Sequence, residues 1–175
     1  MKKVAASLML SSLCLALLTP GFAFAKEEQV FMKRKPGYWI ADIENSAMPG
    51  TKVKYKECSN EESDKRLLNQ SLGNDSATSC DVSSKKSGSG YLSEMSCSGE
   101  AAGQTFKMSA TFDAQGDFEK AFTINGSMTM EGLPLPPIKM VMKYKYQGEC
   151  PAGMEVGDLI TEGLPGGPKK INILK

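Results

Sequence analysis

Hydrophobic and polar residues alternate with a period of two along most of this chain. In "QTFKMSATF", residues 104–112, one side carries Phe106, Met108, Ala110 and Phe112, and the other carries only polar residues. The segments "GYWIADIE" and "TKVKYKEC" alternate in the same way. This period predicts strands that bury one face and expose the other to water.

The second half predicts a long hairpin. We expect "DAQGD" to turn the chain after residue 112, and the next strand to bury Phe118, Phe122, Ile124, Met128 and Met130. Gly126 lies within this strand and predicts a bulge or a bend. The proline-rich segment "EGLPLPPIK" then connects it to a closing strand in "MVMKYKYQGEC".

A single helical signal stands out, in "SNEESDKRLL". Ser59 could cap the helix, with Glu62 three residues later completing a capping box. Without βα repeats, the pattern predicts an all-β antiparallel meander of about seven strands. We expect a small barrel or a curved half-barrel, with the short helix after the second strand and two disulfides.

Both ends of the chain differ from this middle part. Residues 1–25 have the basic start, apolar run and "AFA" cleavage site of a signal peptide, with cleavage expected near Ala25. We expect an arm over 26–35, the β domain over 36–150 and a loosely packed Gly/Pro-rich tail over 151–175. The predicted location is the periplasm or the exterior, with no transmembrane segment.

Composition mainly excludes functions. The chain has no histidine, which removes Ser-His-Asp and Cys-His catalysis and His-ligated zinc. Without Lys2 and Lys3, 19 basic residues face 20 acidic ones, so bulk charge gives no reason to expect a nucleic-acid partner. Asp42 and Glu44 could form a carboxylate pair, but alternating charges on a strand usually face water. We expect no enzymatic activity and no cofactor.

Four cysteines remain after the predicted cleavage, which suggests two disulfides in an exported chain. If "SGSG" is the turn of a hairpin, Cys80 lies opposite Cys97, and Val82 lies opposite Met95 on the same face. Opposed residues are close enough for a disulfide after modest adjustment. Cys58 would then pair with Cys150. The alternative, four thiolates on zinc, lacks a CxxC pair.

Several of these segments together resemble a known family. They are "KPGYWIADIE", "YKEC", "SCDV", "SEMSCSG" and "KYKYQGEC", with Gly37, Trp39 and the four cysteines in order. They resemble bacterial exported proteins grouped as domain of unknown function 3617, over roughly residues 36–150. The resemblance implies a periplasmic β domain without an established activity. The tail after Cys150 and Tyr38 in the first strand depart from the family pattern.

The methionines of the hairpin have two interpretations. A hairpin centred on Leu135 sets Met128 against Met142 and Met130 against Met140, and four thioethers on one face could bind Cu(I). The same face continues into aromatic and aliphatic residues, as in an ordinary core or a cavity lining. As lining of a ligand cavity we expect Phe106, Met108, Phe122, Ile124, Met128, Met130, Met140, Met142 and Tyr144.

The connector supplies the expected mouth of this cavity. Its apolar residues Leu133, Leu135 and Ile138 alternate with prolines. They either contact a lipid surface or another protein, or fold back to plug the open end of the sheet. Our leading prediction is a domain that binds a small apolar ligand. Cu(I) binding and interaction with an envelope protein are the alternatives.

Overall fold

The described part of the chain forms one antiparallel sheet and one helix. The computed structural model describes residues 30–71, 78–101, 104–132 and 135–175, so the predicted signal peptide lies outside the described residues. The elements are β1 (Gly37–Asn45), β2 (Val53–Ser59), α1 (Glu61–Ser71), β3 (Thr78–Ser87), β4 (Gly90–Ala101), β5 (Gln104–Asp117), β6 (Ala121–Glu131), β7 (Ile138–Gly148), β8 (Asp158–Glu162) and β9 (Lys169–Asn172).

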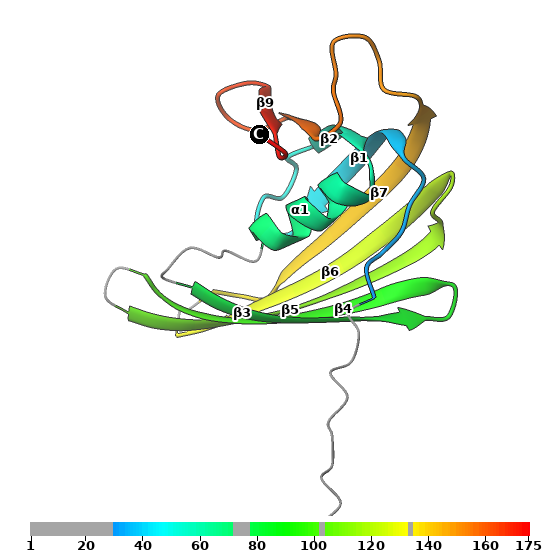
Figure 1. Cartoon of the computed structure of the whole chain (residues 1–175). Helices are drawn as coiled ribbons and strands as arrows, with labels where there is room; N and C mark the ends of the chain where they lie inside the picture. Colours follow the sequence, from blue (N-terminus) through cyan, green and yellow to red (C-terminus); the bar gives the residue numbers. More distant parts are fainter. Residues whose placement is uncertain (1–29, 72–77, 102–103, 133–134) are drawn as a thin grey trace, which may run out of the picture.

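The strands follow the order β3-β4-β5-β6-β7-β1-β2-β8-β9, and β3 and β9 form two separate edges. The sheet is therefore open, and of the two predicted architectures the curved half-barrel is confirmed. Strands β3 to β7 follow one another as a meander, whereas β1 lies between β7 and β2 near the middle of the sheet. Figure 1 shows how the sheet curves, with α1 inside the curve.

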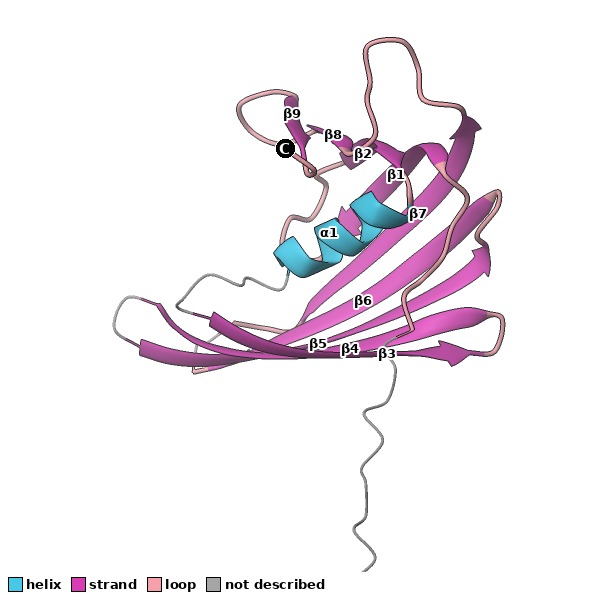
Figure 2. Cartoon of the chain, in the orientation of Figure 1, coloured by secondary structure: helices cyan, strands magenta, loops and turns pink. Residues whose placement is uncertain are grey.

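The core lies on the concave face. Trp39 and Ala41 of β1 are fully buried, together with Phe122 of β6 and Tyr144 of β7. The charged residues of the same strands face the convex side, where Lys143 pairs with Glu44. The two faces follow from the period of two in the sequence. Figure 2 shows helix α1, in cyan, lying over this concave face of the sheet. Within the described ranges, no helix is both long enough and apolar enough to cross a membrane.

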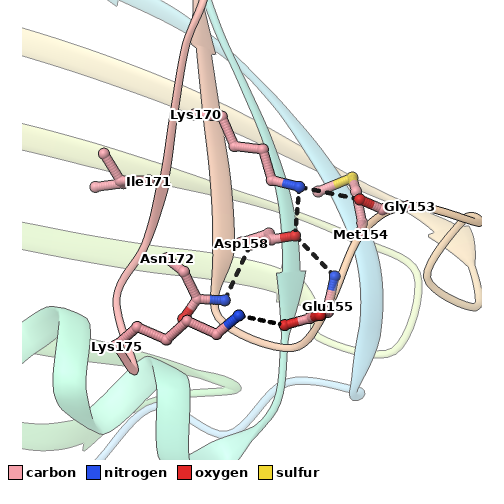
Figure 3. Close-up of a pocket in the computed structure, with 8 residues that line it drawn as sticks. All are labelled: Gly153, Met154, Glu155, Asp158, Lys170, Ile171, Asn172 and Lys175. Carbon is pink, nitrogen blue, oxygen red and sulfur yellow. Dashed lines mark hydrogen bonds and ion pairs between the residues drawn. The ribbon is translucent and has the colours of Figure 1, made fainter.

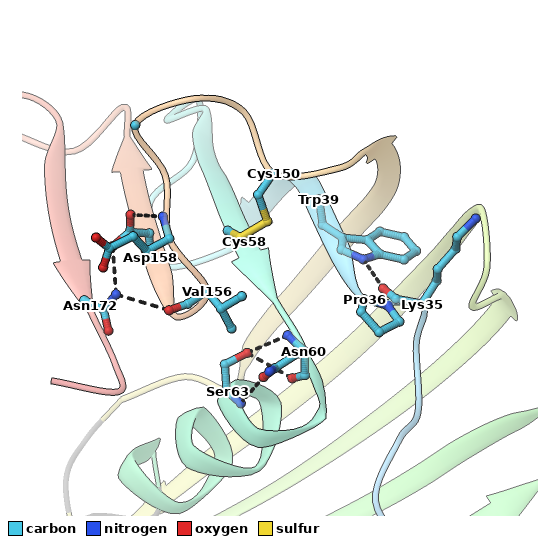
Figure 4. The surroundings of a disulfide bond; sticks show 12 residues. Lys35, Pro36, Trp39, Cys58, Asn60, Ser63, Cys150, Val156, Asp158 and Asn172 are labelled. Carbon is cyan, nitrogen blue, oxygen red and sulfur yellow. Dashed lines mark hydrogen bonds between the residues drawn. A yellow bond between two sulfur atoms is a disulfide. The ribbon is translucent and has the colours of Figure 1, made fainter.

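Both predicted disulfides are present. Cys80 lies opposite Cys97, and Val82 lies opposite Met95, in the predicted register. Cys58 at the end of β2 is bonded to Cys150, just after β7 (Figure 4). Because β2 and β7 are the two neighbours of β1, this second bond clamps both strands at one end of β1 rather than closing a barrel.

Three local predictions were wrong. The helix is capped one residue later than predicted, since the Ser63 amide donates to Asn60 Oδ1 and the Asn60 amide donates to Ser63 Oγ. The segment "DAQGD" belongs to β5, and the turn lies at residues 118–120. The chain after Cys150 is no loose tail, because β8 pairs with β2 and β9 pairs with β8.

Two glycines are required by close packing between strands. Gly37 has φ +134°, and a β carbon there would lie 2.5 Å from the carbonyl oxygen of Gly148. Gly126 does not form the predicted bulge, since β5 and β6 pair around it without a register shift. The space above Gly126 is filled by the ring of Phe112, which lies directly opposite.

Candidate functional site

A cavity of about 250 Å³ lies on the concave face. Its floor is formed by strands β3 to β7 and is mostly apolar or aromatic. The residues of the floor are Ser84, Tyr91, Ser93, Phe112, Ala114, Ile124, Met142 and Tyr144. The floor residues of β4 to β7 lie in adjacent rows of the sheet, because Tyr91 pairs with Ala114, Ala114 with Ile124 and Ile124 with Met142.

The other walls come from two segments that lie over the sheet, the chain before β1 and helix α1. These residues are Phe31, Met32, Arg34, Glu61, Asp64, Lys65, Leu67 and Leu68. The chain before β1, which we call the arm (residues 30–36), is fixed at two points by its backbone. The Val30 amide donates to the Ser84 carbonyl oxygen, and the Lys35 amide donates to the Phe118 carbonyl oxygen. The arm that the sequence predicted over 26–35 therefore packs against the sheet from residue 30 onward.

Arg34 locks the arm to β2 and α1. Its guanidinium donates two hydrogen bonds to Glu57, both of 2.9 Å, and two to Asp64, of 3.0 and 2.7 Å. The side chains of Arg34 and Glu57 are 4% and 6% exposed. Bidentate pairs of this kind are the strong form of ion pair. Removing one partner of a buried pair leaves an uncompensated charge, which typically costs about 3–5 kcal/mol.

Aromatic rings surround the same guanidinium. The Cζ atom of Arg34 lies 5.5 Å from the ring centroid of Trp39 and 5.3 Å from that of Tyr144. Burial by itself would lower the pKa of Arg34, but Glu57 and Asp64 more than offset this and hold it well above its ordinary value. Burial also raises the pKa of Tyr144, so this phenol stays neutral. The arginine is a permanently charged, fully enclosed structural group.

Only part of the predicted lining reaches the cavity. Ile124, Met142 and Tyr144 line it as predicted. Phe122 instead lies in the core, stacked on Tyr144 with ring centroids 4.6 Å apart and packed edge-on against Trp39. Met140 packs against the same core. The remaining predicted residues, Phe106, Met108, Met128 and Met130, are half-buried but are not among the residues that line the cavity.

The predicted register of the methionine hairpin is wrong. Met128 lies opposite Ile138, and Met142 lies opposite Ile124, so β6 and β7 are shifted by four residues from the expected pairing. The methionines meet across other strands. Met130 lies opposite Met108, and Ala110 lies between Met95 and Met128 in the next row. We call Met95, Met108, Met128 and Met130 the methionine cluster.

The three apolar residues of the connector between β6 and β7 differ in their surroundings. Leu135 is 51% exposed, which contradicts the prediction that it plugs the end of the sheet. Ile138 is half-buried and begins β7. Leu133 lies outside the described residues.

A second hollow lies between the loop after Cys150 and strand β9 (Figure 3). Its volume is about 510 Å³ and its walls are polar. The buried carboxylate of Asp158 accepts hydrogen bonds from the Glu155 amide, Lys170 Nζ and Asn172 Nδ2 at 2.7–2.9 Å. Lys170 above all, and then the other two donors, lower the pKa of Asp158 to about 2. These groups satisfy one another and hold the loop after Cys150 against β9.

Sequence reasoning missed most of the polar wall of the cavity. Arg34, Asp64 and Lys65 show no periodicity that would place them over the sheet, because their partners are far along the chain or on a short helix. The one signal in the sequence was the basic segment "KRK", residues 33–35, just before the first strand. A basic residue there can pair with buried carboxylates, as Arg34 does with Glu57 and Asp64. The described ranges contain no group of three or more histidine, cysteine, aspartate and glutamate side chains that could hold a metal ion.

The comparisons with known proteins identify a family but give no activity. No curated protein matches the chain, and no solved structure matches it. One family model matches residues 34–150, from the arginine of the arm to the cysteine that closes the β2–β7 clamp. The expected resemblance is confirmed over well more than half of the chain, and strands β8 and β9 lie beyond the matched range. The chain belongs to the family described as protein of unknown function (DUF3617).

Proposed function

We propose that this protein is a non-enzymatic carrier that holds a small apolar ligand in the cavity between the sheet, α1 and the arm. The observation that supports it most is the cavity itself, a concave space with an apolar floor and a few polar groups on one side. Sites for small molecules typically combine these two features. The exposed apolar residue of the connector, Leu135, lies outside this cavity and is not part of the proposed site.

The volume limits the size of the ligand. A cavity of about 250 Å³ is larger than the engineered cavity of about 150 Å³ that holds benzene, and slightly smaller than the usual range of about 300–1,000 Å³. A short acyl chain or a compact compound of one to three rings fits this space. Met32 and Met142 line opposite sides of it, and flexible thioethers can adapt to ligands of different shapes.

The proposed location is the periplasm or the exterior. Two disulfides support it, because disulfides persist in oxidising compartments. A carrier in such a compartment would meet apolar compounds that are poorly soluble in water. The proposed ligand is then a compound of the envelope or the exterior rather than of cytoplasmic metabolism.

Filling the cavity from the sheet side tests the proposal. Ala114 is 5% exposed and lines the cavity, and Ala110 is 4% exposed, on the same face of β5 but outside the lining. We expect Ala114→Leu to weaken binding of the neutral fluorescent probe N-phenyl-1-naphthylamine by roughly 5- to 150-fold, since overpacking of this size typically costs about 1–3 kcal/mol. The matched variant Ala110→Leu should retain binding.

Two folding controls and one further measurement accompany this test. Circular dichroism and the fluorescence of Trp39, the single tryptophan, report whether each variant is folded. Equal probe affinity in folded Ala114→Leu and in the original protein would refute a ligand in this cavity. Native mass spectrometry of the protein from its host then identifies a bound small molecule, whereas a co-purifying protein would favour the role in envelope interactions.

Cu(I) binding is the second candidate, and the methionine cluster is the observation that favours it. Met108 and Met130 are directly opposed, and the small side chain of Ala110 leaves room between Met95 and Met128. Opposed residues have Cβ atoms about 4.5–5.5 Å apart, near enough for two thioethers to share one ion. Thioethers are soft ligands that suit Cu(I). The disulfide Cys80–Cys97 closes one end of this region.

Two pairs of methionines, one across β5 and β6 and one within β7, give a matched test. We expect Met108→Leu with Met130→Leu to abolish Cu(I) binding, measured by competition with a chromogenic Cu(I) chelator. Met140→Leu with Met142→Leu should leave it unchanged, since these residues lie opposite Gly126 and Ile124. Equal loss in both double variants, or no Cu(I) binding by the original protein, would reject the candidate.

A further inference from the structure

The charges of the buried side chains next to the cavity do not cancel. Arg34 carries one positive charge, while Glu57 and Asp64 carry two negative charges against it. The three side chains are only 4%, 6% and 18% exposed, so water screens this difference poorly. The buried group of three therefore has a net charge of −1 beside an apolar space.

Arg34 cannot serve as an anion receptor. Four of its five N–H donors are directed at Glu57 and Asp64. Its guanidinium also lies against the rings of Trp39 and Tyr144. A ligand carboxylate entering the cavity would meet an arginine that is already neutralised, together with one excess negative charge.

Asp64 is the acceptor that a ligand can reach. It lines the cavity and is the most exposed member of the group, whereas Glu57 does not line it. A carboxylate has about four lone-pair sites, and Arg34 uses one on each oxygen of Asp64. Each oxygen of Asp64 therefore retains capacity for a further N–H donor.

The other charged groups near the cavity do not reverse this sign. Glu61 and Lys65 also line it but form an exposed ion pair of 2.6 Å with each other. Lys33 of the arm is exposed and contributes to lowering the pKa of Glu61, after the hydrogen bond from Lys65. Exposed charges of this kind are weakened by water and salt far more than the buried group is.

We propose that the cavity selects amphiphiles with a cationic, N–H-donating head group, which binds the carboxylate of Asp64 while the apolar part lies on the floor of the sheet, and that it disfavours carboxylate head groups. This inference rests on the proposed ligand-carrier function. It adds the chemical class of the ligand, a primary amine or a similar cation on a short apolar chain.

Three probes with a ten-carbon chain test the selection in the full protein: decylamine, decan-1-ol and decanoate. The two ionic probes are kept below their micelle concentrations and decan-1-ol below its solubility limit, and binding of each is followed by displacement of N-phenyl-1-naphthylamine. We expect decylamine to bind at least about tenfold more tightly than decanoate, with decan-1-ol between them. The preference should persist at high salt because the charges are buried. Stronger binding of decanoate, or a preference that salt removes, would overturn the inference.

Variants assign the effect to the buried group. Asp64→Asn makes the group neutral and should reduce the amine-to-carboxylate preference about tenfold. If this variant does not fold, the comparison of the three probes in the original protein decides. Lys65→Gln is the control at the rim, because its exposed charge is screened by water and its removal should change the preference little. An unchanged preference in folded Asp64→Asn contradicts the inference. If none of the three probes binds, including decan-1-ol, the ligand-carrier function itself fails.

Discussion

Gly126 lies directly opposite Phe112, and the space that its missing side chain leaves is filled by the phenyl ring. A β carbon at Gly126 would come within 3.0 Å of ring carbons Cδ1 and Cε1 of Phe112. Phe112 in turn lines the cavity. The glycine therefore helps to set the position of one wall of the proposed site.

Gly126→Ala is expected to destabilise the protein and to change the cavity. Alanine normally stabilises a strand relative to glycine, but here its methyl group must displace the ring of Phe112, at a typical cost of about 1–3 kcal/mol. Urea denaturation measures the change, and binding of the naphthylamine probe reports the cavity. Restored stability in Gly126→Ala with Phe112→Leu would confirm the contact, and a stabilised single variant would contradict it.

Arg34→Met is expected to lower the free energy of unfolding by about 3–5 kcal/mol, since Glu57 would remain buried without its partner. Lys143→Met is the matched control. Lys143 pairs with Glu44 at 3.0 Å, but both side chains are more than half exposed, so its loss should cost less than about 1 kcal/mol. Equal small effects in guanidinium denaturation would show that the arm is not locked by Arg34.

The lowered pKa of Asp158 predicts that part of the protein's stability is lost at acidic pH. Its folded pKa of about 2 lies below the ordinary value of about 3.9, so its ionised form stabilises the folded state above pH about 4. This contribution falls as the pH drops from about 4 towards about 2. Asp158→Asn should flatten the pH dependence of the melting temperature in this window.

The exposed carboxylate Asp42 provides the control for that measurement. Asp42→Asn removes the same formal charge from the convex face, where its contact with Lys54 is 3.6 Å and largely exposed. If Asp42→Asn and Asp158→Asn flatten the acid limb equally, the network around Asp158 does not cause the effect.

The two disulfides should differ in their contribution to stability. In the loop-entropy account, a sequence separation of 17 residues between Cys80 and Cys97 corresponds to about 3 kcal/mol, and one of 92 between Cys58 and Cys150 to almost 4.7 kcal/mol. Replacing each pair by serines and measuring urea denaturation tests this order. A larger loss without Cys80–Cys97 would show that native contacts outweigh loop length.

Strand registers were predicted correctly where the sequence of the turn determines how the two flanking strands pair. The Cys80–Cys97 hairpin was predicted in the correct register because Gly88, with φ +60°, allows a tight turn. The proline-rich connector between β6 and β7 has no comparable signal, and the predicted pairing of Met128 with Met142 was wrong by four residues. The predicted face of each side chain was still correct, because a register shift of four residues, an even number, leaves every side chain on the same face of the sheet.

The parts of the site outside the sheet could not be predicted in this way. Packing of the arm depends on contacts between Arg34 and residues 23 and 30 positions away. The helix cap moved by one residue because Asn60 and Ser63 satisfy each other as well as Ser59 and Glu62 could have done. Strands β8 and β9 are only five and four residues long, too short for a period of two to be recognised.

The central position of β1 has a consequence for the order of folding. Trp39 and Ala41 of β1 pair with Tyr146 and Tyr144 of β7, about a hundred residues later in the chain. Strands β3 to β6 can form as successive local hairpins, but the core around Trp39 must wait until β7 is available. Contacts of such long sequence separation slow folding, because the chain entropy is lost before the contacts form. During synthesis, the aromatic core can therefore form only after most of the chain, through β7, has emerged.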